Sequence, residues 1–116
     1  LSRVIFGGTA IRGNPGTEID RRVSMISKNI FTKSRGDAFY NLELDAFLAK
    51  NRVNELILVG LDAEYCVYST ARGALNRGYK VIIITDAILL GDRNKWDSLM
   101  EKYRTLGITL MPSREL

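Results

Sequence analysis

The stretch Leu56-Ile57-Leu58-Val59-Gly60-Leu61-Asp62-Ala63-Glu64-Tyr65-Cys66-Val67 decides the fold. It opens with four consecutive apolar residues, so a strand formed here has to be buried on both faces. A glycine and a short polar loop follow, and a helical pattern begins near Cys66. A strand buried on both faces that runs directly into a helix is typical of a parallel sheet covered by helices.

The same arrangement repeats toward the C-terminus. Val81-Ile82-Ile83-Ile84 and Ile108-Thr109-Leu110-Met111 are further apolar runs, and strand starts near 56, 81 and 108 have the spacing of successive βαβ units. The helical patterns between these runs have recognisable end signals, namely Gly78 and Gly107 as C-terminal caps and Asn94 as an N-cap. We expect right-handed crossovers between the strands.

The first third of the chain has weaker signals. A short helix is expected with Leu44, Phe47 and Leu48 on one face. Ile30-Phe31-Thr32 and Val4-Ile5-Phe6 are candidate strands. A second helix begins after Thr17, its N-cap, and has Ile19, Val23 and Ile26 on one face. A doubly wound sheet usually has about five or six strands, and here three candidates have strong signals and two have weak ones. We therefore predict one α/β domain, a three-layer α/β/α fold with a mainly parallel, Rossmann-like sheet that lacks its first strand or strands.

Length and composition exclude several classes of protein. The chain has 116 residues, 46% hydrophobic and 26% charged, as expected for one small globular domain. One cysteine and no histidine exclude an internal disulfide, a histidine-dependent triad and a histidine metal site, so we expect neither cofactor nor metal. No apolar run approaches the roughly 20 residues of a membrane helix, and no signal peptide opens the chain. We therefore expect a cytoplasmic protein without a membrane partner.

The net charge of +4 comes from 17 basic and 13 acidic residues that are interleaved along the chain. The longest basic run is the pair Arg21-Arg22, so we expect a mixed, solvated surface and no nucleic-acid partner. A basic nucleic-acid accessory protein is the weakest of the alternatives.

Cys66 is the first candidate for chemistry. In open parallel sheets the active site lies outside the carboxyl ends of the strands, and three such ends can be identified: the loop before Cys66, Thr85-Asp86, and Lys33 after the short upstream run. Cys66 falls at or next to the first turn of a helix, where unpaired N–H groups and the helix dipole favour a thiolate and can hold an oxyanion. The alternative is an inert core cysteine.

A block of residues around Cys66 carries a family pattern. In Gly60 to Ala71, a glycine and a short loop precede a Cys-Val pair that opens a helix with Thr-Ala, and Gly78-Tyr79 and Asp86-Ala87 follow. This block resembles the isochorismatase-like cysteine hydrolases, which include nicotinamidases. Upstream, Phe31-Thr32-Lys33 with Asp37-Ala38-Phe39 is similar to the lysine segment of that family, and Pro15-Gly16-Thr17-Glu18-Ile19 to an abbreviated Gly-Thr-x-Gly-x-Glu-Leu region.

The resemblance implies a catalytic triad of aspartate, lysine and cysteine. By residue matching, Cys66 is the nucleophile and Lys33 the lysine. The resemblance also implies a cis peptide bond between Leu61 and Asp62, which turns the Asp62 amide toward the Cys66 amide to form an oxyanion hole.

The aspartate of that triad has no match in this sequence. The family places it in an Asp-hydrophobic-Gln setting at the end of the first strand, and nothing in residues 1–32 fits. Asp20 falls inside a helical pattern, and Asp37 is a minor alternative that otherwise has a loop or capping role. The histidine metal site of some family members lies in the same unmatched part. The match covers roughly residues 14–116. Because the part of the family pattern that carries the aspartate and the metal site is missing, we expect residues 1–116 to be the C-terminal two-thirds of one isochorismatase-like domain.

Other residues near these positions have weaker assignments. Phe39 and Tyr65 are candidates to line a pocket for an aromatic or planar amide, with core packing as the alternative. Glu64 is expected to be a surface carboxylate, Asp86 a structural hydrogen-bonding residue and Trp96 a core residue.

The resemblance thus implies a cysteine hydrolase that cleaves a C–N amide bond of a small molecule through a thioester. Vinyl-ether hydrolysis of isochorismate, another reaction of this scaffold, needs no cysteine, so Cys66 argues against it. The missing aspartate motivates the alternative, a non-catalytic or truncated member of the same fold that acts as an interaction or assembly subunit. Members of the family are often oligomeric, and we expect a homo-oligomer.

Overall fold

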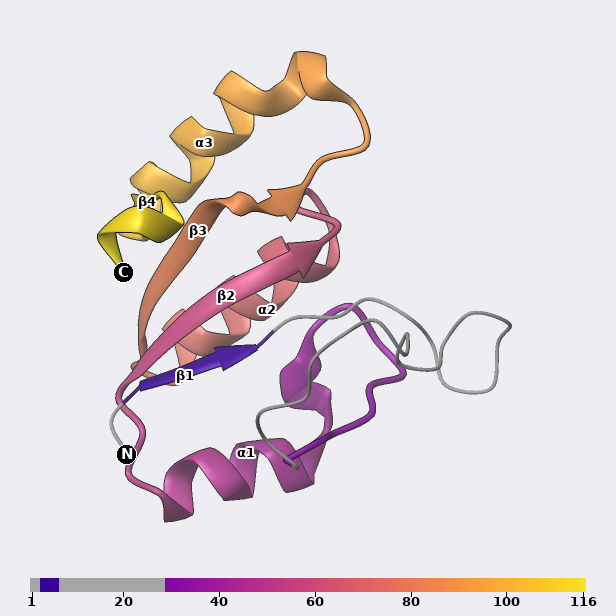
Figure 1. Ribbon diagram of the computed structural model, residues 1–116. Coiled ribbons are helices and arrows are strands. Elements are labelled where there is room, and N and C mark those ends of the chain that lie inside the picture. The colour runs from indigo at the N-terminus through magenta and orange to yellow at the C-terminus, as the bar shows by residue number, and fades with distance from the viewer. Residues whose placement is uncertain (1–2, 7–28) are drawn as a thin grey trace.

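The computed structural model describes residues 3–6 and 29–116, and its strands form one four-stranded sheet with parallel ladders throughout (Figure 1). The strands lie in chain order: β1 (Arg3–Phe6), β2 (Glu55–Leu61), β3 (Lys80–Leu89) and β4 (Thr109–Met111). All three predicted apolar runs are strands, and so is the weaker candidate Val4-Ile5-Phe6. The α/β class with a parallel sheet is therefore confirmed.

The described α-helices are α1 (Leu42–Lys50), α2 (Cys66–Asn76) and α3 (Trp96–Thr105). Their buried hydrophobic residues belong to a single cluster with Leu56, Leu58 and Ile83 on one face of the sheet. Figure 1 shows the helices following one another in the order of the strands. Right-handed crossovers between strands in chain order place every helix on the same face. A helix layer on the other face requires a reversal of strand order, which no described segment provides.

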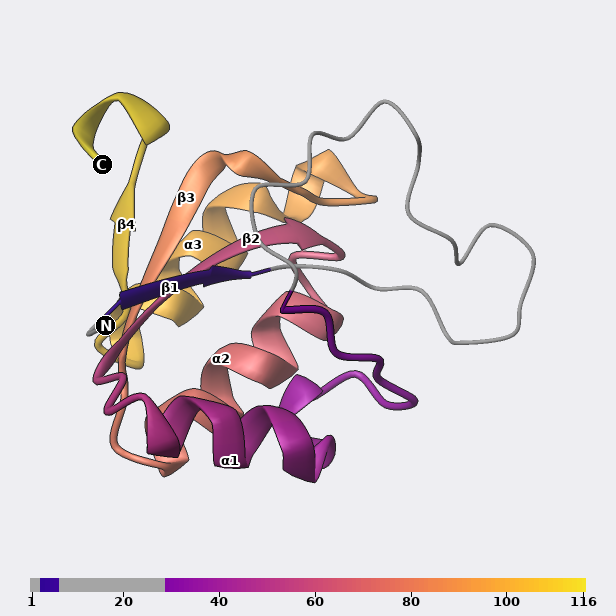
Figure 2. The same ribbon diagram turned by 60° about the horizontal axis from the view of Figure 1, so that its bottom comes forward.

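The opposite face of the sheet is also apolar. Ile57, Ile82 and Ile84 form a second buried cluster, with Val59 and Met111 packed against it. β2 and β3 are thus buried on both faces, as their uninterrupted apolar runs predict. Figure 2 shows the short β4 beside β3 at the edge of the sheet.

The prediction of a strand at Ile30-Phe31-Thr32 is wrong. These residues form no ladder, and the backbone carbonyl of Thr32 accepts a hydrogen bond from the Asn41 side chain at 2.6 Å. The ring of Phe31 packs against Phe47 on α1, with 5.3 Å between the ring centroids. The apolar character of this run therefore reflects packing on α1.

The helix ends agree with the glycine signals but not with the predicted N-cap of α3. Gly78 and Gly107 follow α2 and α3 with φ of 88° and 85°, a left-handed conformation that favours glycine. Asn94 is not a cap; it lies inside a 3-10 turn, η2 (Arg93–Lys95), whose N-cap is Asp92. The Asp92 carboxylate accepts a hydrogen bond from the Asn94 amide at 3.0 Å. The chain enters α3 directly from this turn.

β3 extends beyond the predicted end at Thr85-Asp86. It pairs with β2 up to Ile83, shifts register, and pairs again where Ile88 and Leu89 face Gly60 and Leu61. The carboxyl end of β3 is therefore at Leu89. Asp86 has the structural role expected of it, because its carboxylate accepts hydrogen bonds from the amide and the hydroxyl of Ser113 at 2.8 and 2.7 Å.

Three predictions lie outside the described residues: the helix after Thr17, the position of Asp20 within it, and the resemblance of Pro15–Ile19 to the family pattern. Within the described part of the chain, no helix is long and apolar enough to cross a membrane.

Candidate active site

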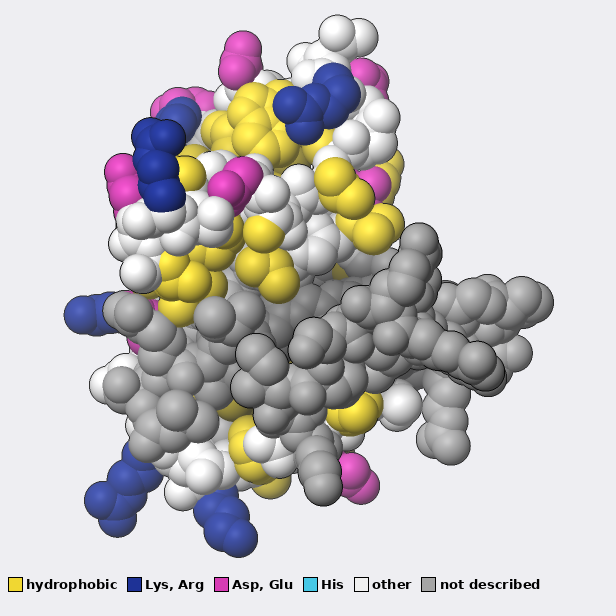
Figure 3. All heavy atoms as spheres, viewed as in Figure 1, with side chains coloured by type: hydrophobic (Ala, Val, Ile, Leu, Met, Phe, Trp, Pro, Cys, Tyr) yellow, Lys and Arg dark blue, Asp and Glu magenta, His cyan; other side chains and the backbone are white. Residues whose placement is uncertain are grey.

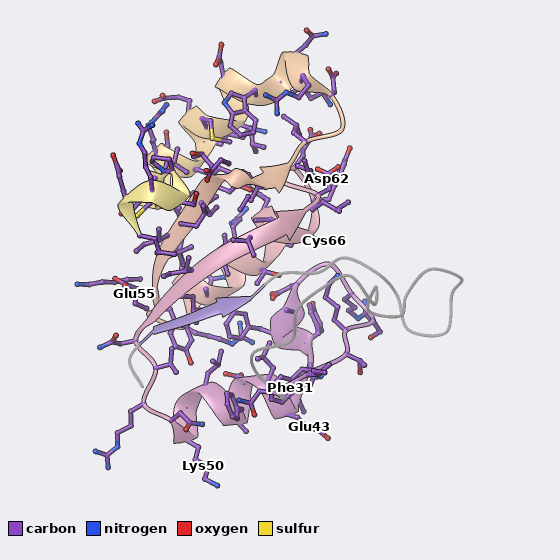
Figure 4. The ribbon with its side chains drawn as sticks, in the orientation of Figure 1. Phe31, Glu43, Lys50, Glu55, Asp62 and Cys66 are labelled. Atoms are coloured by element: carbon purple, nitrogen blue, oxygen red, sulfur yellow. The ribbon has the colours of Figure 1, made fainter. Side chains whose placement is uncertain are left out.

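Cys66 is the first residue of α2 and directly follows the loop that leaves β2. Figure 4 shows Cys66 and Asp62 close together at the carboxyl end of this strand. Cys66 is half-buried. This is the position that the sequence predicts.

The peptide bond between Leu61 and Asp62 is cis, as the resemblance implies. The next three amides of the loop have acceptors close by. The Ala63 amide donates to the Leu89 carbonyl at 2.8 Å, and the Glu64 and Tyr65 amides donate to the carboxylate and the carbonyl of Asp62 at 2.8 and 3.1 Å.

The amides of Asp62 and Cys66 differ from those three. No described residue accepts a hydrogen bond from either of them. Cys66 begins a helix, whose first N–H groups have no intrahelical partner, and the N-terminal end carries the positive pole of the helix dipole. As far as the described residues go, these two amides are available to donate to an oxygen held next to the thiol.

Side chains of α3 and of the preceding turn η2 also hold this loop, by contacts that were not visible in the sequence. The buried hydroxyl of Tyr103 donates a hydrogen bond to the carbonyl of Ala63. Lys95 forms an ion pair with the Glu64 carboxylate at 3.2 Å, and this hydrogen bond raises the pKa of Lys95. Glu64 is the partly exposed surface carboxylate that we expected. The sequence signal for the Tyr103 contact is a tyrosine on an apolar helix face. The hydroxyl of a buried tyrosine usually finds a hydrogen-bond acceptor, but the sequence does not say which one.

Lys33 lies in the segment before α1. Its ammonium donates to the Arg35 carbonyl at 3.3 Å, and it lines a cavity of about 310 Å³ together with Thr32, Ser34, Tyr40 and Asn41. No hydrogen bond within the described residues joins Lys33 to Cys66.

The segment after Lys33 is docked on the face of α2 that carries Cys66. The Thr70 hydroxyl accepts from the Ala38 amide at 3.0 Å and donates to the Gly36 carbonyl at 3.2 Å. A Cβ on Gly36 would lie 3.6 Å from the Ser69 hydroxyl. Ser69 and Thr70 are three and four residues after Cys66, hence on the same helix face. Lys33 is three residues before Gly36, a chain length of about 10 Å at most.

Phe39 does not join Cys66 in a pocket. Its side chain is 1% exposed, its ring stacks with Tyr79 at 5.8 Å between centroids, and the Arg77 guanidinium lies 4.6 Å from the ring centre. Arg77 and Tyr79 follow the C-terminal end of α2, whereas Cys66 begins this helix. The structure thus places Phe39 in the core, the alternative left open by the sequence.

Tyr65 is placed differently. Its side chain is exposed (61%), and so are those of Leu61 (47%) and Leu89 (63%). Leu61 pairs with Leu89 where β2 and β3 end. Figure 3 shows apolar side chains at the surface beside these strand ends. The three side chains provide an accessible apolar rim next to Cys66.

Asp37 is not positioned to replace the missing catalytic aspartate. Its carboxylate accepts from the Phe39 amide at 2.8 Å and caps the 3-10 turn η1 (Ala38–Tyr40). It lies against Gly73, seven residues after Cys66 and thus about 10 Å further along α2. Among the described residues, no carboxylate has a hydrogen bond or ion pair with Cys66 or Lys33.

The residues of this chain do not fit the metal site found in some proteins of the family that the sequence resembles. The sequence has no histidine, and the described part contains no cluster of three acidic or cysteine side chains suited to a metal ion.

The family model for the isochorismatase domain matches residues 3–115. The chain belongs to the isochorismatase family. N-carbamoylsarcosine amidase from an Arthrobacter species is 35% identical over 77 residues, 66% of this chain and 28% of that relative. Nicotinamidase from Escherichia coli K12 is 49% identical over 43 residues, 37% of this chain and 20% of that relative.

Solved structures of the isochorismatase family agree with this assignment. The crystal structure of N-carbamoylsarcosine amidase from Thermoplasma acidophilum superposes with a TM-score of 0.75 at 31% identity, covering 90% of this chain and 60% of that one. This chain thus spans well under half of the two curated relatives and about three-fifths of the solved structure.

Proposed function

We propose that this isochorismatase-family chain hydrolyses the C–N amide bond of a small molecule through a thioester on Cys66. The observation that carries the proposal is the arrangement at the start of α2. A half-buried thiol lies at a helix N-terminus, and the amides of Asp62 and Cys66 have no acceptor among the described residues. Two N–H groups beside a nucleophile are what a tetrahedral oxyanion requires.

The reaction has two stages. The thiol proton passes to a carboxylate, the sulfur attacks the amide carbon, and the carbonyl oxygen becomes an oxyanion held by the amides of Asp62 and Cys66. The C–N bond then breaks, the amine leaves with the proton, and an acyl thioester remains on Cys66. Water hydrolyses the thioester to the acid and restores the thiol.

Two charged groups complete this scheme. Lys33, on the segment docked against α2, stabilises the thiolate and the carboxylate. The carboxylate is the aspartate that the family resemblance implies. It has no match in this sequence, and none of the described acidic side chains takes its role, so the proposal requires a protein that supplies it.

We propose a small, planar amide as substrate. The exposed ring of Tyr65 and the side chains of Leu61 and Leu89 offer it an apolar rim. Two relatives, N-carbamoylsarcosine amidase and nicotinamidase, carry names of amide-cleaving enzymes, which agrees with this class. A cytoplasmic, reducing setting suits a lone free thiol, and a homo-oligomer is part of the proposal.

The experiment is ammonia release from a panel of small primary amides, with nicotinamide and N-carbamoylsarcosine as first members. We expect turnover by a protein that also supplies the catalytic aspartate, none by its Cys66→Ala variant, and normal turnover by the control Ser98→Ala on α3. Intact mass spectrometry of quenched reactions should show an acyl adduct, which the sole cysteine of the chain assigns to Cys66. Turnover retained in Cys66→Ala would exclude the thioester.

The alternative, a non-catalytic interaction subunit, predicts an unreactive thiol. Rapid alkylation of Cys66 by iodoacetamide at neutral pH contradicts that alternative. Slow alkylation together with no turnover on the whole panel would favour it over the hydrolase.

A further inference from the structure

Tyr103 links α3 to the loop before Cys66. Its hydroxyl donates a hydrogen bond to the Ala63 carbonyl, and both residues are 0% exposed. The two residues are 40 positions apart, so only the folded chain makes this contact. The Tyr103 ring packs against Tyr68 on α2, with 5.7 Å between the centroids. A single side chain therefore contacts both α2 and the loop that precedes it.

Ala63 occupies a central position in this loop. It directly follows Asp62 and lies three residues before Cys66. Its amide donates to the Leu89 carbonyl at 2.8 Å, and its carbonyl accepts from Tyr103, so β3 fixes one side of its backbone and α3 the other. Ala63 lies between Asp62 and Cys66 in the chain, so the position of its backbone bears on the spacing of these two amides.

The other side-chain contact from this region is weaker. Lys95 and Glu64 form an ion pair at 3.2 Å with both side chains partly exposed. Solvent-exposed ion pairs contribute little, because water and salt screen them. A buried hydrogen bond to a carbonyl that water cannot reach is harder to replace.

The Tyr103 phenol remains a donor wherever the enzyme can work. Burial, with smaller effects from Tyr68 and Asp62, raises its pKa well above that of a free tyrosine. The hydroxyl therefore stays protonated and keeps its hydrogen bond to Ala63.

We propose that Tyr103 is a positioning residue, whose hydroxyl holds Ala63 and thereby sets the spacing of the Asp62 and Cys66 amides for the oxyanion. This inference rests on the proposed amide hydrolysis. Tyr103 touches neither Cys66 nor the substrate rim formed by Leu61, Tyr65 and Leu89, and it acts through the backbone of the loop.

The kinetic test compares Tyr103→Phe with Tyr68→Phe. The first variant removes the hydroxyl bound to Ala63 and keeps the ring. The second removes a hydroxyl with no hydrogen bond within the described residues. For Tyr103→Phe we expect kcat to fall by about 10- to 100-fold with KM within about threefold, because the amides act on the developing oxyanion. Tyr68→Phe should stay within about threefold. An unchanged kcat in Tyr103→Phe, or a rise in KM alone, overturns the proposal.

A second test does not depend on turnover. In Tyr103→Phe, hydrogen exchange at the Ala63 amide should accelerate at least about tenfold, with the amides of α1 unchanged as an internal control. Unchanged exchange at Ala63 overturns the proposal even in an active enzyme. If the protein that also supplies the catalytic aspartate cleaves no amide, the proposed function fails, and this exchange experiment still decides whether Tyr103 holds the loop.

If Tyr103→Phe does not fold, hydrogen exchange in the wild-type chain provides the test. There we expect the Ala63 amide to exchange no more than about tenfold faster than amides at the centre of α3, since Tyr103 joins the two. Much faster exchange at Ala63 would show that α3 does not support the loop.

Discussion

The hydroxyl of Thr70 accepts a hydrogen bond from the backbone amide of Ala38 at 3.0 Å. The same hydroxyl donates to the Gly36 carbonyl at 3.2 Å, and Thr70 is 5% exposed. Thr70 lies four residues after Cys66 on α2, so one buried side chain holds the segment that follows Lys33 against the helix that begins with Cys66. The candidate site therefore depends on a contact between segments that are more than thirty residues apart.

Thr70→Val tests this contact. Valine keeps the branched shape and removes the hydroxyl, which leaves the Ala38 amide and the Gly36 carbonyl without their partner. We expect the free energy of unfolding to fall by about 1–3 kcal/mol in urea denaturation. Thr105→Val is the matched control, because that hydroxyl is exposed on α3 and bonds only the Glu101 carbonyl. Its effect should stay within about 0.5 kcal/mol, and equal losses in the two variants would contradict the assignment.

Lys33→Met tests the proposed cation. A nearby positive charge favours the thiolate, so its removal should slow alkylation of Cys66 by iodoacetamide and lower kcat/KM for amide hydrolysis by about tenfold or more. Lys50→Met is the control, since Figure 4 shows Lys50 at the end of α1 away from Cys66. Similar rates for wild type and Lys33→Met would remove Lys33 from the site.

Gly73→Ala tests the packing of η1 on α2. A Cβ at this buried position would lie 2.5 Å from a carboxylate oxygen of Asp37, which caps η1. Alanine usually stabilises a helix by about 1 kcal/mol over glycine, but here the collision should dominate and lower the unfolding free energy by about 1–3 kcal/mol.

The Asp37→Ala background isolates the cause of that loss. There the obstructing carboxylate is absent, and Gly73→Ala should become neutral or stabilising by up to about 1 kcal/mol. A double-mutant cycle by urea denaturation measures the difference. The same loss in both backgrounds would show that Asp37 is not what limits residue 73.

The Asp86–Ser113 contact should depend on pH. Hydrogen bonds from the Ser113 hydroxyl and amide lower the pKa of Asp86 below the ordinary value of about 3.8. A carboxylate with a lowered folded-state pKa contributes stability above its unfolded pKa, and the contribution is lost as the pH falls through the folded value. The Ser113 amide resonance should therefore stay constant from neutral pH to about pH 4 and shift only below it.

Ser113→Ala is the control for this titration. It removes the hydroxyl, the larger cause of the shift, so the pKa of Asp86 should move back toward its ordinary value. An NMR titration of the Asp86 carboxyl group measures both proteins. A wild-type midpoint at or above that of the variant would disprove the role of Ser113.

The strands of this fold were predictable because their chemistry is local. Leu56–Val59 and Val81–Ile84 are continuous apolar runs, and only a sheet covered on both faces buries such runs completely. Gly78 and Gly107 were predictable for a similar reason, since a left-handed residue after a helix favours glycine.

The errors concern features that depend on distant partners. Asp86 suggests the end of a strand, but its carboxylate is satisfied by Ser113, 27 residues away, and β3 continues to Leu89. Ile30-Phe31-Thr32 has the composition of a strand, yet Phe31 packs against Phe47 on α1. Neither partner is visible in the local sequence.

The candidate site shows the same division. Cys66 and the cis bond between Leu61 and Asp62 follow from a contiguous motif, and the structure has both where the motif implies. Phe39, a candidate to line a pocket for a planar amide with core packing as the alternative, is buried near the C-terminal end of α2. The contact of Tyr103 was not predictable, because its acceptor is a backbone carbonyl, a group that every residue carries.

During synthesis, Ala63 leaves the ribosome 40 residues before Tyr103 does. β2 and β3 can pair as they emerge, because each strand of this sheet adds next to the one made before it. The loop before Cys66 has to wait for α3 to supply the hydroxyl that holds it. A nascent chain thus pairs β2 with β3 before the loop ahead of Cys66 is in order, and α3, translated after both strands, completes the contacts of that loop.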